Sequence, residues 1–222
     1  MGTGRLPMPR GVAIRAAEVA TGERVPAVPR DAATLVLLRP GSPDSSDFEV
    51  LLLCRTRAMD FAPGAHVFPG GSVDPDDADV VAAAVRETFE ECGVRVDAAD
   101  LVPWSRWITP VVSDRRFDTW FFVAALPPDS PPDMGTAEVS GAESDAAEWL
   151  TPVAALDAAR AGRITLLPPT AVTLASLTMF TGIDDVLAQH RTITPLMPSV
   201  VVEDGKPWLE LPELPDGVEY PL

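Results

Sequence analysis

Three glutamates within one short segment are the residues of this sequence whose types and spacing most clearly indicate chemistry. Glu87, Glu90 and Glu91 stand at positions i, i+3 and i+4, a spacing that places their side chains on one face of a helix. Like charges so close together repel each other, whereas a divalent cation between them converts the repulsion into binding. Carboxylate oxygens are ligands that Mg²⁺ and Mn²⁺ prefer. The spacing therefore predicts a metal site for Mg²⁺ or Mn²⁺; the alternative is a solvated acidic face.

The helix that carries these glutamates is predicted to run from Asp77 to Cys92, with Gly93 just past its end. Apolar or small residues recur along it at helical spacing, which predicts one buried face opposite the glutamates. These residues are Val81, Val85, Thr88, Phe89 and Cys92.

The flanks of the three glutamates carry a resemblance to a known family. Gly70 and Gly71 precede the helix, and Arg86 directly precedes the first glutamate. The segment 86–94, RETFEECGV, resembles the second half of the Nudix hydrolase signature G-x5-E-x7-R-E-U-x-E-E-x-G-U, in which U is apolar. Thr88 departs from it at a position that is usually apolar.

The first half of that signature fits less well. The step from Gly71 to Arg86 is one residue longer than in the family pattern, so the first-half glutamate has no clean counterpart. A one-residue insertion in the loop would place Asp77 at its position. Alternatively, Asp77 caps the helix.

The resemblance implies an α+β fold, the Nudix α/β/α sandwich with a mixed central sheet. It implies that Glu90 and Glu91 are the main metal ligands, and that Glu87 is a third ligand or orients bound water. Arg86 is expected to hold a glutamate by an ion pair rather than to touch substrate.

A further acid is expected from the loop before the last core strand, because Nudix enzymes often supply one there. Glu143 is our candidate catalytic residue, as a ligand or general base, and Asp145 is the alternative. Glu148 is expected at the surface. The same stretch also reads as an ordinary polar loop.

The loop before the helix is similar to the coenzyme A branch of the family, whose extra motif is L-L-T-x-R-S followed by G-x3-F-P-G-G. Residues 64–71 match the second half fully. In the first half Leu51, Leu52 and Arg55 match, while Leu53 replaces Thr and Thr56 replaces Ser. This similarity implies that Arg55, Gly70 and Gly71 contribute to substrate binding.

A coenzyme A substrate needs a site for its separate 3′-phosphate as well as for its pyrophosphate. Arg115 and Arg116 could bind that phosphate through forked hydrogen bonds; the alternative is a solvated turn between strands. His66 stands beside the glycines, where a packing or turn role is favoured over that of a base.

The expected reaction is metal-dependent hydrolysis of a pyrophosphate bond in a nucleoside diphosphate linked to another moiety. With CoA or acyl-CoA the products are 3′,5′-ADP and (acyl-)4′-phosphopantetheine. One alternative is a Nudix pyrophosphatase acting on ADP-ribose, NADH or a nucleoside triphosphate. Another is a sensor of the same fold that binds a nucleotide without hydrolysing it.

The elements that must position these residues follow from apolar runs and turn residues. An arm without clear periodicity is expected over residues 1–30, the Nudix domain over 31–165, and an extension with helices and a hairpin over 166–222. This extension covers the core, shapes an acyl pocket or builds a homodimer interface. Strands are predicted at 32–39 and 48–55, which form a hairpin, and at 104–112, 117–126 and 146–150. Later signals are a helix from Thr151-Pro152 to Gly162, a helix capped by Thr170, and a hairpin at Asp204-Gly205.

The composition argues against several other classes of protein. With 17 Lys and Arg against 33 Asp and Glu, the 222-residue chain has a formal net charge of −16. Such a surface repels nucleic-acid backbones but leaves a small nucleotide substrate possible at a metal site. No apolar run is long enough to span a membrane. Cys54 and Cys92 lack disulfide or zinc spacing, so we interpret them as buried hydrophobes of a cytoplasmic protein.

Overall fold

Strand β2 (Arg30–Pro40) lies at the centre of the fold in the computed structural model. The structure describes residues 4–41, 47–56, 63–130, 144–215 and 218–222. β2 pairs in parallel with β7 (Phe117–Ala125) and antiparallel with β3 (Phe48–Arg55). The predicted hairpin of strands 32–39 and 48–55 is therefore confirmed.

The central sheet is mixed, as expected. Its other strands are β4 (Ala65–Val67), β5 (Gly70–Ser72), β6 (Val102–Ile108), β8 (Ser144–Leu150), β9 (Thr165–Leu166) and β10 (Pro195–Leu196). Within the described residues the order is β10-β6-β7-β2-β3-β4-β9, with β5 beside β2 and β8 beside β3. β6 stops at Ile108, short of the predicted 112, and residues 111 and 112 form a turn.

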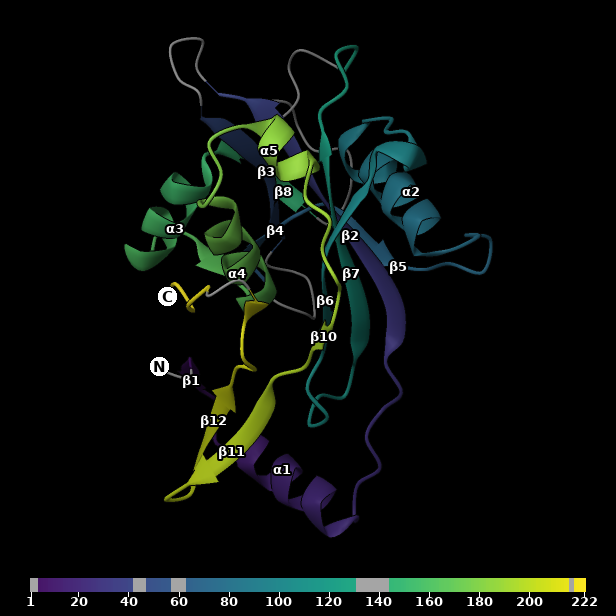
Figure 1. Ribbon diagram of the computed structural model, residues 1–222. Helices are drawn as coiled ribbons and strands as arrows, with labels where there is room; N and C mark the ends of the chain where they lie inside the picture. The colour runs from purple at the N-terminus through teal and green to yellow at the C-terminus, as the bar shows by residue number, and fades with distance from the viewer. Residues whose placement is uncertain (1–3, 42–46, 57–62, 131–143, 216–217) are drawn as a thin grey trace.

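Helices cover both faces of this sheet, which confirms the α/β/α sandwich (Figure 1). One face carries α2 (Val80–Cys92), and the short 3-10 helix η1 (Ala98–Asp100) follows it. The other carries α3 (Pro152–Arg160), α4 (Pro168–Leu177) and α5 (Ile183–Leu187). Alternate residues of β2 serve the two layers, since Leu35 and Leu37 pack toward α2 while Val36 and Leu38 pack toward α3 and α4.

A small second sheet joins the two ends of the chain. Its strands are β1 (Arg5–Pro7), β12 (Lys206–Glu210) and β11 (Ser199–Glu203), and α1 (Gly11–Thr21) lies beside it (Figure 1). The predicted hairpin is confirmed: Asp204 and Gly205 both have positive φ, 51° and 73°, as a two-residue turn of this kind requires. Helix α1 was not predicted within residues 1–30, and only Val12 of it is buried.

The caps of α3 and α4 differ from one another. Thr151 accepts a hydrogen bond from the Ala154 amide at 3.1 Å, so the predicted cap of α3 is confirmed. The predicted cap of α4 is wrong: the helix begins at Pro168, and Thr170 is a buried residue within its first turn. Two prolines at the start hold helical φ angles without needing a side-chain cap.

Candidate functional site

Helix α2 begins two to three residues later than predicted. Asp79 is its N-cap, and the Asp79 carboxylate accepts hydrogen bonds from the amides of Val81 and Ala82, both at 2.9 Å. The capping role proposed for Asp77 is therefore wrong. The far end is as predicted, because α2 ends at Cys92 and Gly93 follows in a left-handed conformation.

Small residues form the fully buried part of the α2 face, and the predicted Val81, Val85 and Cys92 pack half-buried beside them. Ala83, Ala84 and Thr88 are fully buried, and the Thr88 hydroxyl donates to the Ala84 carbonyl at 2.7 Å. This bond satisfies the hydroxyl that stands at a usually apolar position of the motif. Phe89 is 40% exposed and stacks on Arg95, contrary to prediction. A face of small residues lets the helix lie close to β2 and β5.

Close packing requires glycine at both positions of β5, against β2 at Gly70 and against α2 at Gly71. A Cβ atom on Gly70 would lie 2.3 Å from the Ala33 carbonyl oxygen, and one on Gly71 would lie 2.2 Å from Oε1 of Glu87. The Gly70 amide also donates a hydrogen bond to Glu91 Oε2 at 2.9 Å. The two glycines, predicted as substrate residues, thus position two of the three glutamates of α2.

Arg86 forms the centre of an ion-pair cluster. Its Nη1 donates to Glu87 Oε1 at 2.9 Å and to Glu90 Oε2 at 3.1 Å, so the expected ion pair with a glutamate is present. Its Nη2 donates to Asp77 Oδ2 at 2.8 Å and to the Ser72 carbonyl at 3.0 Å. One guanidinium therefore ties the loop before α2 to the carboxylates on α2.

Asp77 is the residue of this cluster whose role the sequence left open. Its side chain is only 6% exposed, and the hydrogen bonds from Arg86 lower the pKa of the Asp77 carboxyl. The longer loop is closed by local bonds, since the Asp77 amide donates to the Asp74 carbonyl and the Asp74 amide donates to the Asp77 carboxylate. Asp77 thus holds Arg86 in place.

The three glutamates sit in different environments. Burial raises the pKa of the Glu87 carboxyl, although Arg86 opposes this effect. The Glu87 side chain is 17% exposed and that of Glu90 is 56% exposed. The Glu87 carboxylate therefore lies half-buried against Gly71 of β5, whereas the Glu90 carboxylate is exposed to solvent.

The chemistry of the cluster fits a hard divalent cation, because its ligating atoms are carboxylate oxygens. In their present rotamers, no three His, Cys, Asp or Glu side chains of the described residues are grouped as a metal site. Glu87 and Glu90 face Arg86, whereas Glu91 faces the Gly70 amide. Coordination by all three glutamates would require Glu87 and Glu90 to exchange Arg86 for the ion.

The predicted phosphate-binding arginines do not join this cluster. Arg116 is 8% exposed, and its guanidinium donates to the backbone carbonyls of Thr109 and Ala27 at 2.9 and 2.8 Å. Its role is to fix the turn before β7, and we no longer assign it to substrate. Arg115 is exposed on the same turn, which lies at the lower end of the sheet while α2 lies at the upper right (Figure 1).

The remaining predicted residues are placed as follows. Arg55 is half-buried at the end of β3, where its carbonyl accepts a bond from the Gly64 amide at 3.1 Å. Glu143 and the side chain of Asp145 lie outside the described residues. Glu148 is exposed on β8, as predicted.

Burial shifts the pKa of two further titratable groups, His66 and the half-buried Cys92. His66 on β4 is 8% exposed, and burial lowers the pKa of its imidazole, which fits the packing role predicted for it. Burial and the neighbouring Glu91 raise the pKa of the Cys92 thiol to about 12, so this thiol is not a nucleophile at neutral pH.

Comparison with known proteins agrees with this geometry. The model of the NUDIX domain matches residues 28–168. A nudix hydrolase of Caenorhabditis elegans is 30% identical over 167 residues, covering 58% of this chain and 55% of that protein. The acyl-coenzyme A diphosphatase NUDT19 of Xenopus laevis is 23% identical, covering 81% of this chain and 71% of that protein.

A solved structure supports the same assignment. The crystal structure of a NUDIX hydrolase from Alicyclobacillus acidocaldarius superposes with a TM-score of 0.64 at 27% identity, covering 73% of this chain and 97% of that one. The chain spans little more than half the length of the worm relative. Among the described residues, no helix combines the length and apolarity needed to cross a bilayer.

Proposed function

Since this chain belongs to the Nudix family, we propose that it is a metal-dependent pyrophosphohydrolase that cleaves the diphosphate of a nucleotide conjugate. The observation that carries the proposal is the placement of Glu87, Glu90 and Glu91 on one helix beside the glycines of β5, with Arg86 bonded to the first two and the Gly70 amide to the third. These groups belong to rigid elements, as a hydrolytic site requires.

Glu87, Glu90 and Glu91 are the residues that would hold Mg²⁺ or Mn²⁺. When bound, such an ion lowers the pKa of a water molecule and neutralises charge on the diphosphate. The protein's other residues position Arg86 and the glutamates. Asp77 and the Ser72 carbonyl retain Arg86 when the glutamates release it, and the Gly70 amide orients Glu91.

For the substrate, we propose CoA or acyl-CoA, cleaved to 3′,5′-ADP and (acyl-)4′-phosphopantetheine. The G-x3-F-P-G-G sequence at residues 64–71 supports this assignment, as does the similarity to the frog acyl-coenzyme A diphosphatase. Arg55 at the end of β3 remains our candidate for a substrate phosphate, with Arg115 as the second. Glu143 remains the proposed additional acid.

The proposal is tested by digesting CoA in ¹⁸O-labelled water with Mn²⁺ and analysing the products by mass spectrometry. We expect the two products named above, with the label on one new phosphate. Glu90→Gln and Glu91→Gln should each lower turnover by more than the roughly 10–100-fold that loss of a group supporting a metal ligand costs, while Glu23→Gln on an exposed loop should not.

The alternatives give different results in the same assay. Cleavage of ADP-ribose, NADH or a nucleoside triphosphate in preference to CoA would keep the enzyme and replace the substrate. Micromolar nucleotide binding without metal and without turnover would identify a sensor instead. Full activity of both glutamine variants would show that the metal site is misplaced.

A further inference from the structure

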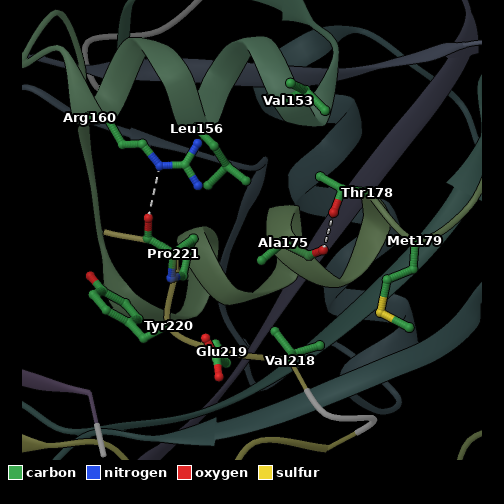
Figure 2. Close-up of a pocket in the computed structure, with 10 residues that line it drawn as sticks. All are labelled: Val153, Leu156, Arg160, Ala175, Thr178, Met179, Val218, Glu219, Tyr220 and Pro221. Carbon is green, nitrogen blue, oxygen red and sulfur yellow. Dashed lines mark hydrogen bonds between the residues drawn. The ribbon is translucent and has the colours of Figure 1, made fainter. Parts of the chain in front are cut away.

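The C-terminal extension and α3 border an open-sided cavity of about 560 Å³, which the proposed hydrolytic function does not use. It lies on the α3 and α4 side of the central sheet, and α2 lies on the opposite side (Figure 1). Figure 2 shows its walls: α3 on one side, the end of α4 on the other, and residues 218–221 along the third. Its volume falls within the range of small-molecule sites.

The walls of this cavity are largely apolar and partly uncovered. Leu156 is 3% exposed and forms part of the core, whereas Val153 and Met179 are 54% and 56% exposed. Val218 completes this side. Large apolar side chains exposed in a concave site gain free energy when an apolar ligand covers them.

One end of the cavity is polar. Arg160 extends its guanidinium into it, with Nε donating to the Pro221 carbonyl at 3.1 Å and Nη1 to Asp157 at 2.9 Å (Figure 2). The pair with Asp157 is half exposed on both sides, so it contributes little and leaves donors of the fork for an anion. Glu219 also lines the cavity, but it is exposed, and its side chain extends away from Arg160 in Figure 2.

We propose that this cavity is a second binding site, for a free medium-chain alkyl carboxylate. The alkyl chain lies between Val153, Leu156 and Met179, and the carboxylate pairs with Arg160. Charge and shape both select this ligand, because an apolar trough that ends at a guanidinium matches an apolar chain that ends at an anion. The central sheet separates this site from the glutamates of α2, so binding here needs neither metal nor turnover.

Calorimetric titration with decanoate, in the presence of EDTA, tests the proposal. We expect saturable binding, with the dissociation constant rising for each methylene removed by up to about fourfold, the value for a methylene fully transferred from water. Acetate and decanol, which supply the head group or the chain alone, should bind at least tenfold more weakly. Failure of decanoate to bind, or equal binding of decanol, would overturn the proposal.

Two variants locate the ligand. Arg160→Gln should weaken decanoate binding at least tenfold, whereas Arg163→Gln, an exposed arginine just beyond α3, should bind as the wild type does. Val153→Asp places a like charge on the exposed wall and should abolish binding, with Val25→Asp as its control on another surface. Thermal unfolding without ligand establishes that each variant is folded. Undiminished binding to both Arg160→Gln and Val153→Asp would refute this location, whatever the outcome of the hydrolysis assay.

Discussion

The two faces of the central sheet are stabilised in different ways. On one face α2 contributes only small buried residues, Ala83, Ala84 and Thr88, and a charged cluster lies along its edge. On the other face α4 buries large side chains such as Leu174 and Leu177. The comparison teaches that the helix with the candidate metal-binding carboxylates is held by small buried residues, half-buried valines and ion pairs, whereas the opposite layer buries larger apolar side chains.

The largest loss of stability is expected where β5 packs against β2. Gly70→Ala would drive a Cβ into the backbone of β2, 2.3 Å from the Ala33 oxygen and 2.7 Å from Thr34 Cα. We expect a loss of about 4 kcal/mol or more in the free energy of unfolding, measured by urea denaturation. Gly71→Ala meets only the movable end of Glu87, so it should remain folded and lose Mn²⁺ affinity. Equal stability of the two variants would contradict this account of the interface.

On the α4 face of the sheet, stability should fall when a buried side chain is made smaller. Leu174→Ala removes a fully buried side chain of the α4 layer and should reduce the free energy of unfolding by about 2–5 kcal/mol. Ala84→Gly, on the α2 face, should reduce it by only about 1 kcal/mol, through helix propensity. If Ala84→Gly proved the more damaging change, the contrast between the two layers would not hold.

An intermediate loss in the free energy of unfolding is expected for Asp77→Asn, which removes the ion pair between Asp77 and Arg86. The variant should lose about 2 kcal/mol of stability at neutral pH, the typical value for a hydrogen bond to a charged group. Because the folded-state pKa of Asp77 is lowered from 3.8, this stabilisation is present above that pH and disappears as the pH falls below it. Urea denaturation at pH 7 and pH 3 checks this; a difference that is unchanged at pH 3 would exclude the ion pair as its cause.

Asp77→Asn should also weaken metal binding. Without Asp77, Arg86 is held more firmly by Glu87 and Glu90, so Mn²⁺ must compete harder for them. We expect electron paramagnetic resonance titration to show weaker Mn²⁺ affinity in Asp77→Asn. Asp76→Asn, an exposed neighbour in the same loop, serves as the control.

The smallest effect is expected for Glu87→Gln without metal. Because burial raises the pKa of Glu87 from 4.5, its ionisation disfavours the folded state above that pH. The variant should therefore be more stable than the wild type at pH 7, by less than about 1 kcal/mol, and equal to it below about pH 4. Thermal unfolding at the two pH values measures this, and a destabilised variant at pH 7 would show that the bond from Arg86 outweighs burial.

Much of the fold could be predicted from local patterns in the sequence. The strands β2, β3 and β7, the end of α2 at Gly93, and the Asp204-Gly205 turn all follow from residue types within a few positions of each other. The buried face of α2 followed only in part. Thr88 is buried as predicted, whereas Phe89 is 40% exposed and two alanines, Ala83 and Ala84, take the deepest positions.

The residues of the candidate site could be predicted from the sequence, but most of their contacts could not. The glutamates and Arg86 follow from their spacing in the sequence. Arg116 binds the Ala27 carbonyl, 89 positions away, and the carbonyl of nearby Thr109. Asp77 binds Arg86 across nine positions, which include the loop and the start of α2. Both arrangements depend on how these segments fold against each other. Sequence periodicity does not report such contacts. One indication in the sequence points to a special role for Asp77: it is an acid in a loop one residue longer than the family pattern.

The pairing of β1 with β12 has a consequence for biosynthesis. Residues 5–7 find their partner at residues 208–210, so almost the whole chain must leave the ribosome before this strand is matched. The core sheet is complete earlier, apart from β10, because its other strands end by residue 166. Folding during translation should therefore proceed from the middle of the chain outward, with the small sheet closing last and bringing the two ends together.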